Sequence, residues 1–377
     1  MISNLVQGGG SLLIGTIVPF LVVLTVVVFV HEMGHYLVGR WCGIGAQAFS
    51  IGFGPELIGF TDRHGTRWKL SAIPLGGYVK FIGDESATSS PVGVNHSRLS
   101  ANERKRAFHT QPVWKRAATV FAGPAFNIIL TVVIFSVFFA LYGRVIADPL
   151  ISGVQPDSPA QEAGFRPGDR FVSVDGEKID TFADVQRIVS GRSGDVLNFT
   201  VERDGKLVEL QATPKLVERT DALGNTIRIG VIGVETSQEV ANFRHIEYGP
   251  LESVRQALIE TGHIIVRTGA FFKRLAMGRE DKCQLGGPVK IANMAGKAAS
   301  HGISWLVQLT AMLSIGIGLL NLFPLPPLDG GHLLFYLVEA IKGGPVSAGA
   351  QEWFYKFGFI LVMGFMSFVL FNDLFAC

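Results

Sequence analysis

The sequence predicts a multi-pass α-helical membrane protein with four transmembrane helices, a membrane-associated β-hairpin region and an exported α+β domain. Three observations predict this fold class. Only 17% of the 377 residues are charged and 48% are hydrophobic, whereas an ordinary soluble domain has about 25% charged residues. Long segments without any charge are separated by a segment, residues 144–301, of ordinary charge density. The net charge of +2 leaves no basic excess for binding nucleic acid, so no nucleic-acid partner is expected.

Four segments free of Asp, Glu, Lys and Arg approach or exceed the length of about 20 residues that a spanning helix needs. They are residues 12–30, 117–143, 302–328 and 357–372, and the last needs residues 353–355 to reach full length. No Lys or Arg precedes the first segment. We therefore predict a retained helix there rather than a cleaved signal peptide.

The distribution of basic residues predicts the orientation. Arg40 and five Lys or Arg residues between 104 and 116 lie in the loop that joins the first two spans. The positive-inside rule places this loop in the cytoplasm. Both chain termini and residues 144–301 are then expected on the outer side of the bilayer.

Residues 44–83 are more apolar than a cytoplasmic loop requires. Two glycine-rich, aromatic and partly alternating runs meet at residues 62–65 and predict a β-hairpin. Such a hairpin either dips into the membrane beside a polar cavity or is an amphipathic hairpin in the cytosol. The sequence leaves both alternatives open.

The exported segment begins with a β-rich domain. Residues 151–179 predict strand, turn, short helix around 160–163, turn and strand, a helix follows to about Ser190, and Asp204-Gly205 predicts a hairpin turn. The order of its SPA, AG, GD and VDG sequences resembles a PDZ domain of the bacterial protease type. Such domains bind extended peptides at a sheet edge, and a spacer without a ligand is the alternative. Residues 249–276 have the apolar spacing of an amphipathic helix.

The sequence HEMGH occupies residues 31–35, directly after the first charge-free segment. Residues four apart on a helix share a face, so His31 and His35 can bind one zinc ion, and Glu32 can accept a proton from water. Chance would produce this pattern about 0.01 times in a chain of this composition. Two interfacial histidines without a metal are the alternative, but ionisable groups at the end of a spanning helix are typical of a functional site.

A catalytic zinc ion normally has three protein ligands, so a third ligand must come from elsewhere. Asp329 follows the third charge-free segment, and the predicted topology brings it to the membrane depth of the two histidines. His332 is a competing ligand, and a helix-capping role is the alternative for Asp329.

Three motifs together resemble the site-2 protease family of intramembrane zinc metalloproteases. They are His31-Glu-x-x-His35, Gly123-Pro-x-x-Asn127, and Asn321-x-x-Pro running into Leu-Asp329-Gly. The resemblance covers essentially the whole chain, and the order of spans with a PDZ-like insertion points to its bacterial RseP branch. One PDZ-like domain is found here, whereas two in tandem are common in that branch, and residues 225–234 are too short for a second.

The resemblance implies roles for these residues. His31, His35 and Asp329 become ligands of Zn²⁺ and Glu32 the general base. Asn321, and Asn127 with less support, lie near the substrate carbonyl, and residues 44–83 become a membrane-reentrant element that receives substrate. The predicted activity is regulated intramembrane proteolysis of single-span membrane proteins, such as anti-sigma-factor-like regulators or remnant signal peptides, in the bacterial inner membrane, with the active site near the cytoplasmic side and both termini periplasmic.

The predicted organisation has six parts. They are the first transmembrane helix with the zinc motif (1–43), the cytoplasmic and reentrant β region (44–116), the second transmembrane helix (117–143), the PDZ-like domain (144–235), the periplasmic amphipathic helix and linker (236–301), and the third and fourth transmembrane helices (302–377). Two rival functions remain. A scaffold with structural zinc would have no use for Glu32, and a zinc transporter would need ionisable residues distributed along its spans.

Overall fold

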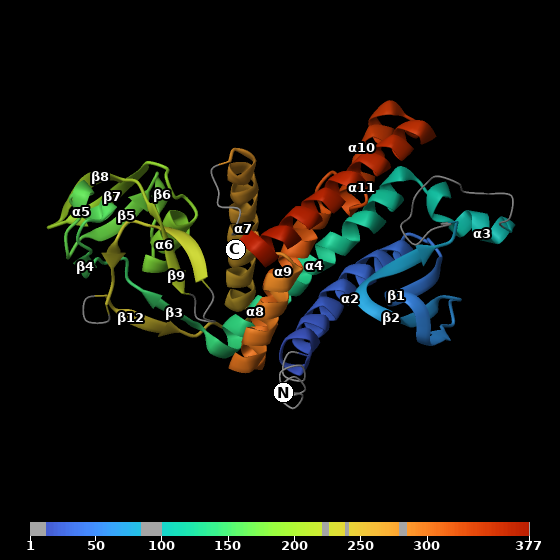
Figure 1. Ribbon diagram of the computed structural model, residues 1–377, viewed down its shortest axis with the longest axis horizontal. Coiled ribbons are helices and arrows are strands. Elements are labelled where there is room, and N and C mark those ends of the chain that lie inside the picture. Colours follow the sequence, from blue (N-terminus) through green and yellow to red (C-terminus); the bar gives the residue numbers. More distant parts are fainter. Residues whose placement is uncertain (1–12, 84–99, 221–225, 238–240, 279–284, 377) are drawn as a thin grey trace. The chain divides into compact units, whose positions relative to one another are not determined.

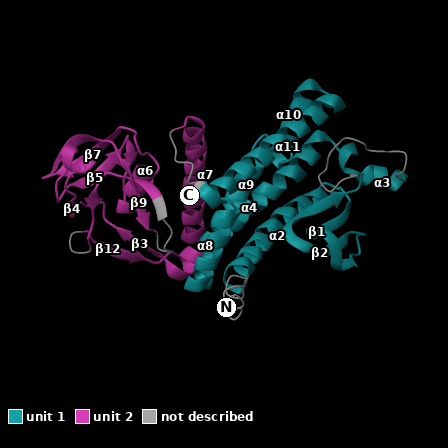
Figure 2. Ribbon diagram, viewed as in Figure 1, with its two compact units in different colours: residues 1–135, 285–377 teal, residues 136–284 magenta. Residues whose placement is uncertain are grey.

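The computed structural model describes residues 13–83, 100–220, 226–237, 241–278 and 285–376. The chain divides into two compact units (Figure 2): unit 1 comprises residues 1–135 and 285–377, and unit 2 comprises residues 136–284. The parts of the predicted organisation that fall on residues 1–12 and 84–99 lie outside the described residues. Each unit is described by itself.

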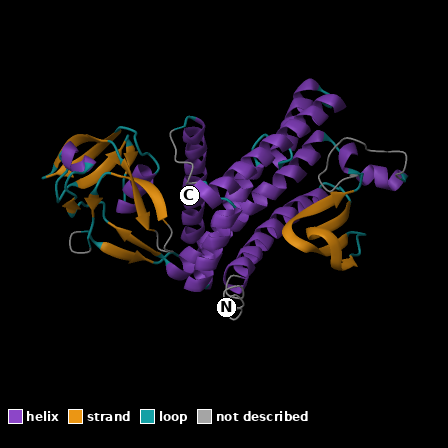
Figure 3. Cartoon of the chain, viewed as in Figure 1, coloured by secondary structure: helices purple, strands orange, loops and turns teal. Residues whose placement is uncertain are grey.

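Unit 1 is built mainly from long apolar helices (Figure 3). Its helices are α2 (Val18–Trp41), α3 (Ala101–Arg106), α4 (Val113–Tyr142), which continues into unit 2, α8 (Pro288–His301), α9 (Ile303–Asn321), α10 (Asp329–Lys342) and α11 (Ala348–Phe371), with π-helical turns at Leu13–Ile17 and Asn372–Ala376 and a 3₁₀ turn at Phe108–Thr110. Four helical segments are long and apolar enough to cross a membrane: Ile14–Trp41, Val113–Tyr142, Ile303–Asn321 and Ala348–Phe375. The four predicted apolar helices are therefore confirmed.

Two helix boundaries differ from the charge-free segments. Helix α4 begins at Val113, four residues before the charge-free segment, and so includes Lys115 and Arg116. Helix α9 ends at Asn321 instead of continuing to 328, and α10 is a separate helix. Proline residues at 324, 326 and 327 lack the N–H group that an α-helix needs, which explains the break.

The predicted hairpin is present as strands β1 (Ala46–Thr61) and β2 (Arg67–Phe81), which lie beside α2 (Figure 1). The pair is strongly bent, since residues 48–51 of β1 pair with both 67–70 and 77–80 of β2, and residues 58–61 pair again with 67–70. Gly52 and Gly54 adopt φ near +87° at the bend of β1, a conformation that glycine tolerates best. Phe49 is fully buried and packs edge-on against Phe29 and Tyr36 of α2.

The described part of unit 2 contains short strands and helices, in addition to the end of α4. The strands are β3 (Arg144–Ala147), β4 (Gly153–Val154), β5 (Arg170–Val174), β6 (Glu177–Lys178), β7 (Leu197–Arg203), β8 (Lys206–Ala212), β9 (Lys215–Thr220), β10 (Thr226–Val231), β11 (Val234–Glu235) and β12 (Phe243–Ile246), and the helices are α5 (Pro159–Ala163), α6 (Phe182–Ser190) and α7 (Pro250–Ala276). One antiparallel sheet has the order β6-β5-β7-β8, and the others are two-stranded. Apolar side chains of β5, α6 and β7 form its core.

The local signals in unit 2 act as predicted. Strands β7 and β8 form a hairpin around Asp204-Gly205, with Arg203 opposite Lys206. Thr181 caps α6 through a reciprocal hydrogen-bond pair with Asp184. Within the described part of 225–234, β10 pairs with β9 and β11 pairs with β4.

Candidate metal centre

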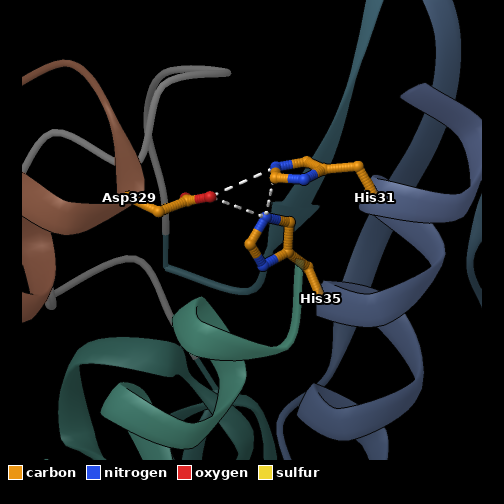
Figure 4. A group of neighbouring side chains, drawn as sticks. All are labelled: His31, His35 and Asp329. Carbon is orange, nitrogen blue, oxygen red and sulfur yellow. Dashed lines mark hydrogen bonds and ion pairs between the residues drawn. The ribbon is translucent and has the colours of Figure 1, made fainter. Parts of the chain in front are cut away.

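Three side chains from two helices converge in unit 1 (Figure 4). His31 and His35 project from one face of α2, and Asp329 is the first residue of α10. The Nε2 atoms of the two histidines are 3.2 Å apart, and the Oδ2 atom of Asp329 lies 3.1 Å from Nε2 of His31 and 3.5 Å from Nε2 of His35. Of the residues described, these three form a cluster with the donor types of a metal site.

The spacing of the three donor atoms fits zinc. Ligands held about 2.0–2.1 Å from a tetrahedral zinc ion lie about 3.3–3.4 Å from each other, close to the three distances in this triangle. Oδ2 of Asp329 is buried and has no hydrogen-bond partner among the described atoms. Its nearest neighbours are the two imidazole nitrogens, and a buried carboxylate is costly unless a positive charge compensates it. A cation between the three donors would supply that charge.

A backbone carbonyl orients His35. Its Nδ1 atom lies 2.9 Å from the carbonyl oxygen of Thr119 in α4. The N–H group at Nδ1 therefore donates to this carbonyl, which leaves the lone pair of Nε2 directed at the metal position. The helix that follows the hairpin thus fixes the tautomer of one predicted ligand.

The side chain of Asn127, also in α4, lies against His31 and is fully buried. Its amide nitrogen is 3.3 Å from Nδ1 of His31, and its Oδ1 atom has no hydrogen-bond partner among the described atoms. The two ends of an amide are interchangeable in shape. If Nε2 of His31 binds a metal, Nδ1 carries the proton. With the Asn127 side-chain amide flipped by 180°, Oδ1 accepts a hydrogen bond from that N–H group. Asn127 therefore lies on the far side of His31 from the metal position.

Glycines in α2 and α4 allow the histidine rings to fit. A Cβ atom on Gly123 would overlap Nε2 of His35 and lie 2.9 Å from Cε1 of His31. A Cβ atom on Gly34, within the HEMGH sequence, would overlap the backbone carbonyl of Ala122. These close approaches were not predicted, although small residues at such positions are typical of tightly packed membrane helices.

Glu32 follows His31 on α2 and is partly buried. Its carboxylate interacts electrostatically with the three clustered residues. A Cβ atom on Gly77 would lie 3.2 Å from Cγ of Glu32. The segment of β2 around Gly77 therefore runs directly beside this side chain.

Asp329 rather than His332 reaches the two histidines. The ring of His332 is buried and lies 3.0 Å from the hydroxyl of Tyr355 in α11. Gly330 and Gly331 pack so closely against residues 322–326 that a Cβ atom on either would overlap the backbone. Asn321 ends α9 eight residues before Asp329 and is partly buried.

A carboxylate at the turn of the hairpin ties β1 and β2 to α2. Asp62 accepts hydrogen bonds from Tyr36 Oη (2.9 Å), Trp68 Nε1 (3.1 Å), His64 N (2.8 Å) and Thr66 N (2.9 Å). Burial by itself raises the pKa of Asp62, but these four hydrogen bonds outweigh it and hold the pKa well below its usual range. Tyr36 directly follows His35, so this contact joins the hairpin to the metal-binding turn of α2.

A family model for "Peptidase family M50" matches residues 19–365 of this chain. The chain belongs to peptidase family M50. This is the site-2 protease family of zinc metalloproteases, as the three sequence motifs predicted, and the triangle of donor atoms is the candidate zinc centre in this chain. With its four apolar helices, this M50 peptidase is a multi-pass membrane protein.

Relatives resemble this M50 peptidase along nearly their whole length. A protein of Brucella suis biovar 1 whose name proposes a zinc metalloprotease is 83% identical over 370 residues, which cover 98% of both chains. One from Mesorhizobium japonicum, named in the same way, is 65% identical and covers 97% of this chain and 100% of its own. The metalloprotease MmpA of Caulobacter vibrioides is 37% identical and covers 95% of each chain.

Among solved structures, the PDZ domain of an SdrC-like protein from Listeria monocytogenes matches 24% of this M50 peptidase and 87% of its own chain. The identity is 19% and the TM-score 0.19. The PDZ-like character of residues 144–235 therefore stays a prediction.

Unit 2 has a cavity of about 590 Å³ between α6, residues 229–234 and α7, and basic side chains of Arg187, Arg219 and Arg267 are among its lining.

Proposed function

We propose that this M50 peptidase is an intramembrane endopeptidase that performs regulated intramembrane proteolysis of single-span membrane proteins. The observation that carries the proposal is the triangle of His31, His35 and Asp329 beside Glu32. The two histidines and Glu32 belong to a helix apolar enough to span the bilayer. Anti-sigma-factor-like regulators and remnant signal peptides are the proposed substrates, because both are single spans that remain in the membrane.

The proposed chemistry follows from the positions of the side chains. His31, His35 and Asp329 would hold zinc, which when bound supplies Lewis acidity toward water and the scissile carbonyl. Glu32 accepts the proton of the attacking water and passes it to the leaving amide nitrogen. Asn321 is proposed to donate to the developing oxyanion, an interaction worth about 3 kcal/mol in other hydrolases. Asn127 is proposed to position His31 through Nδ1, given its contact.

The hairpin is proposed to hold the substrate in an extended conformation. Peptide bonds in a helix are protected by hydrogen bonds, so a spanning substrate must unwind before it is cut. A Cβ atom on Gly77 would lie 3.2 Å from Cγ of Glu32, so β2 runs beside the proposed general base, and a peptide can add to the edge of such a strand. Leu57, Ile58 and Phe60 are 63%, 70% and 61% exposed, which favours the hairpin that dips into the membrane over the cytosolic one.

The decisive experiment replaces the proposed base. Glu32→Gln removes the proton acceptor but leaves the three zinc ligands, so we expect about one zinc per chain and at least a hundredfold slower cleavage of a tagged single-span reporter in membranes. His35→Ala should lose both zinc and cleavage. Retained cleavage by Glu32→Gln would contradict the proposal. Zinc bound without cleavage by the wild-type chain would instead favour the scaffold with a structural metal.

A further inference from the structure

A nearly buried ion pair joins α4 to α10 in unit 1. The Nη2 and Nη1 atoms of Arg116 lie 2.7 Å and 3.1 Å from the two carboxylate oxygens of Glu339. The side chains are only 12% and 16% exposed. This is the two-pronged geometry that gives Arg–carboxylate pairs their directional specificity.

Two further contacts hold the Arg116 guanidinium. Its Nε donates to the carbonyl of Gln111 at 3.0 Å, and its Cζ atom lies 5.0 Å from the ring centre of Tyr336, one turn before Glu339 on α10. Tyr336 is buried and its ring lies 6.5 Å from that of Phe108. The ion pair therefore holds one face of α10 in a single position against α4.

The same two helices carry parts of the metal centre. Helix α10 begins with Asp329, and α4 provides the Thr119 carbonyl that orients His35, one turn after Arg116. Asp329 and Glu339 are separated by ten residues of one helix, about 15 Å along its axis. A displacement of α10 along or around its axis at Glu339 is thus transmitted to Asp329, since a short helix moves as a rigid element.

We propose that the Arg116–Glu339 pair is a positioning device for the metal centre, which sets the place of Asp329 relative to His31 and His35. The inference rests on the proposed role of Asp329 as third ligand. Neither Arg116 nor Glu339 belongs to the metal cluster, so they act on the zinc affinity through α10. The pair lies outside the three motifs that predicted the centre.

The test measures zinc affinity by competition with a chelator, on full-length protein in detergent. Glu339→Gln breaks the pair, and we expect a zinc dissociation constant about 3- to 30-fold higher, the range found for positions that act through an intervening element. At saturating zinc, kcat should return to the wild-type value, because Asp329 is then in place. The double variant R116E/E339R should recover most of the affinity.

A matched control is available on α11. Glu352 pairs with Lys356 at 2.7 Å, but the side chains are 50% and 71% exposed, so Glu352→Gln should leave zinc affinity unchanged. The milder Arg116→Lys keeps the positive charge but loses one of the two hydrogen bonds to Glu339. We expect its zinc affinity to lie between those of the wild type and Glu339→Gln. Wild-type zinc affinity in folded Glu339→Gln or Arg116→Lys would overturn the proposal. The proposed function would fail separately, if Asp329→Asn and His35→Ala kept their zinc.

Discussion

At the scale of single residues, the proposed metal centre depends on residues of α4 that are not themselves among the three metal donors. The HEMGH sequence places two imidazoles on one face of α2, but their rings fit only because α4 has glycine at position 123. The carbonyl of Thr119 and the amide of Asn127 then contact the ring nitrogens that face away from the metal position. Ligand geometry therefore comes from α4 as much as from α2.

Gly123→Ala tests this dependence. The new Cβ atom would overlap Nε2 of His35, so we expect zinc affinity at least tenfold weaker and cleavage reduced in proportion. Alanine favours a helix by about 1 kcal/mol over glycine, so a loss cannot come from a weaker helix. Zinc content of the purified protein and reporter cleavage are the measurements.

Gly316→Ala is the matched control for this substitution. Gly316 lies in α9, and no atom lies within 4 Å of the position where its Cβ would be. We expect this variant to bind zinc and cleave as the wild type does. Equal behaviour of the two alanine variants would show that the histidine rings do not need the space at Gly123.

At the scale of elements, the hairpin is held at its turn as well as along its strands. Asp62 connects the backbone of the turn to the side chains of Tyr36 and Trp68. Trp68 stacks on Phe49, with ring centres 4.5 Å apart. The hairpin and the metal-binding turn of α2 consequently form one packed element, which suits a strand that presents substrate to Glu32.

Asp62→Asn should loosen this element in a pH-dependent way. The folded pKa of Asp62 is lowered, so its stabilisation is present above the unfolded pKa of about 3.9 and is lost as pH falls through the folded value. We expect the variant to unfold about 2–4 °C below the wild type at pH 7, with the gap closing below pH 4. Thermal unfolding followed by tryptophan fluorescence gives both values.

An exposed aspartate provides the comparison. Asp180 pairs with Lys178, and their side chains are 70% and 80% exposed, so Asp180→Asn should change the unfolding temperature little at any pH. A gap between Asp62→Asn and the wild type that stayed constant down to pH 2 would contradict the assigned cause.

At the scale of the whole molecule, the proposed orientation follows from the basic residues near the first two spans. Two spans, Val113–Tyr142 and Ile303–Asn321, lie between the helix of His31 and Asp329. If every apolar helix crosses the bilayer, this even number brings the two residues to one membrane depth. Their contact at 3.1 Å agrees with that arrangement. The proposal places both termini and unit 2 in the periplasm of a bacterial inner membrane, with the metal centre near the cytoplasmic side.

Single-cysteine labelling checks this orientation. In a variant without the natural cysteines, a cysteine at Asp204 should react with an impermeant maleimide added to intact spheroplasts, because Asp204 lies on a hairpin turn of unit 2. A cysteine at Arg104, in α3, should react only after the membrane is opened. The reverse pattern would invert the proposed topology.

Much of the fold could be predicted because it depends on local patterns. Charge-free length predicted the four apolar helices, alternation predicted β1 and β2, and the turn residues Asp204-Gly205 predicted the β7–β8 hairpin. The helix end at Asn321 was missed because hydropathy continues through residues 322–328, whereas the missing N–H groups of three prolines end the helix.

Two donors of the proposed metal centre follow from sequence spacing, because a period of 3.6 residues forces His31 and His35 onto one face. A count of spans brings Asp329 to their depth but brings His332 there as well. The motif resemblance implied Asp329 as the third ligand, and the tertiary structure places Asp329 against the histidines and His332 against Tyr355. The close packing of the histidine rings against Gly123 and the Arg116–Glu339 ion pair are also visible only in the folded chain. These are contacts between helices far apart in sequence. The spacing of side chains along one helix does not show which residues of another helix they will contact.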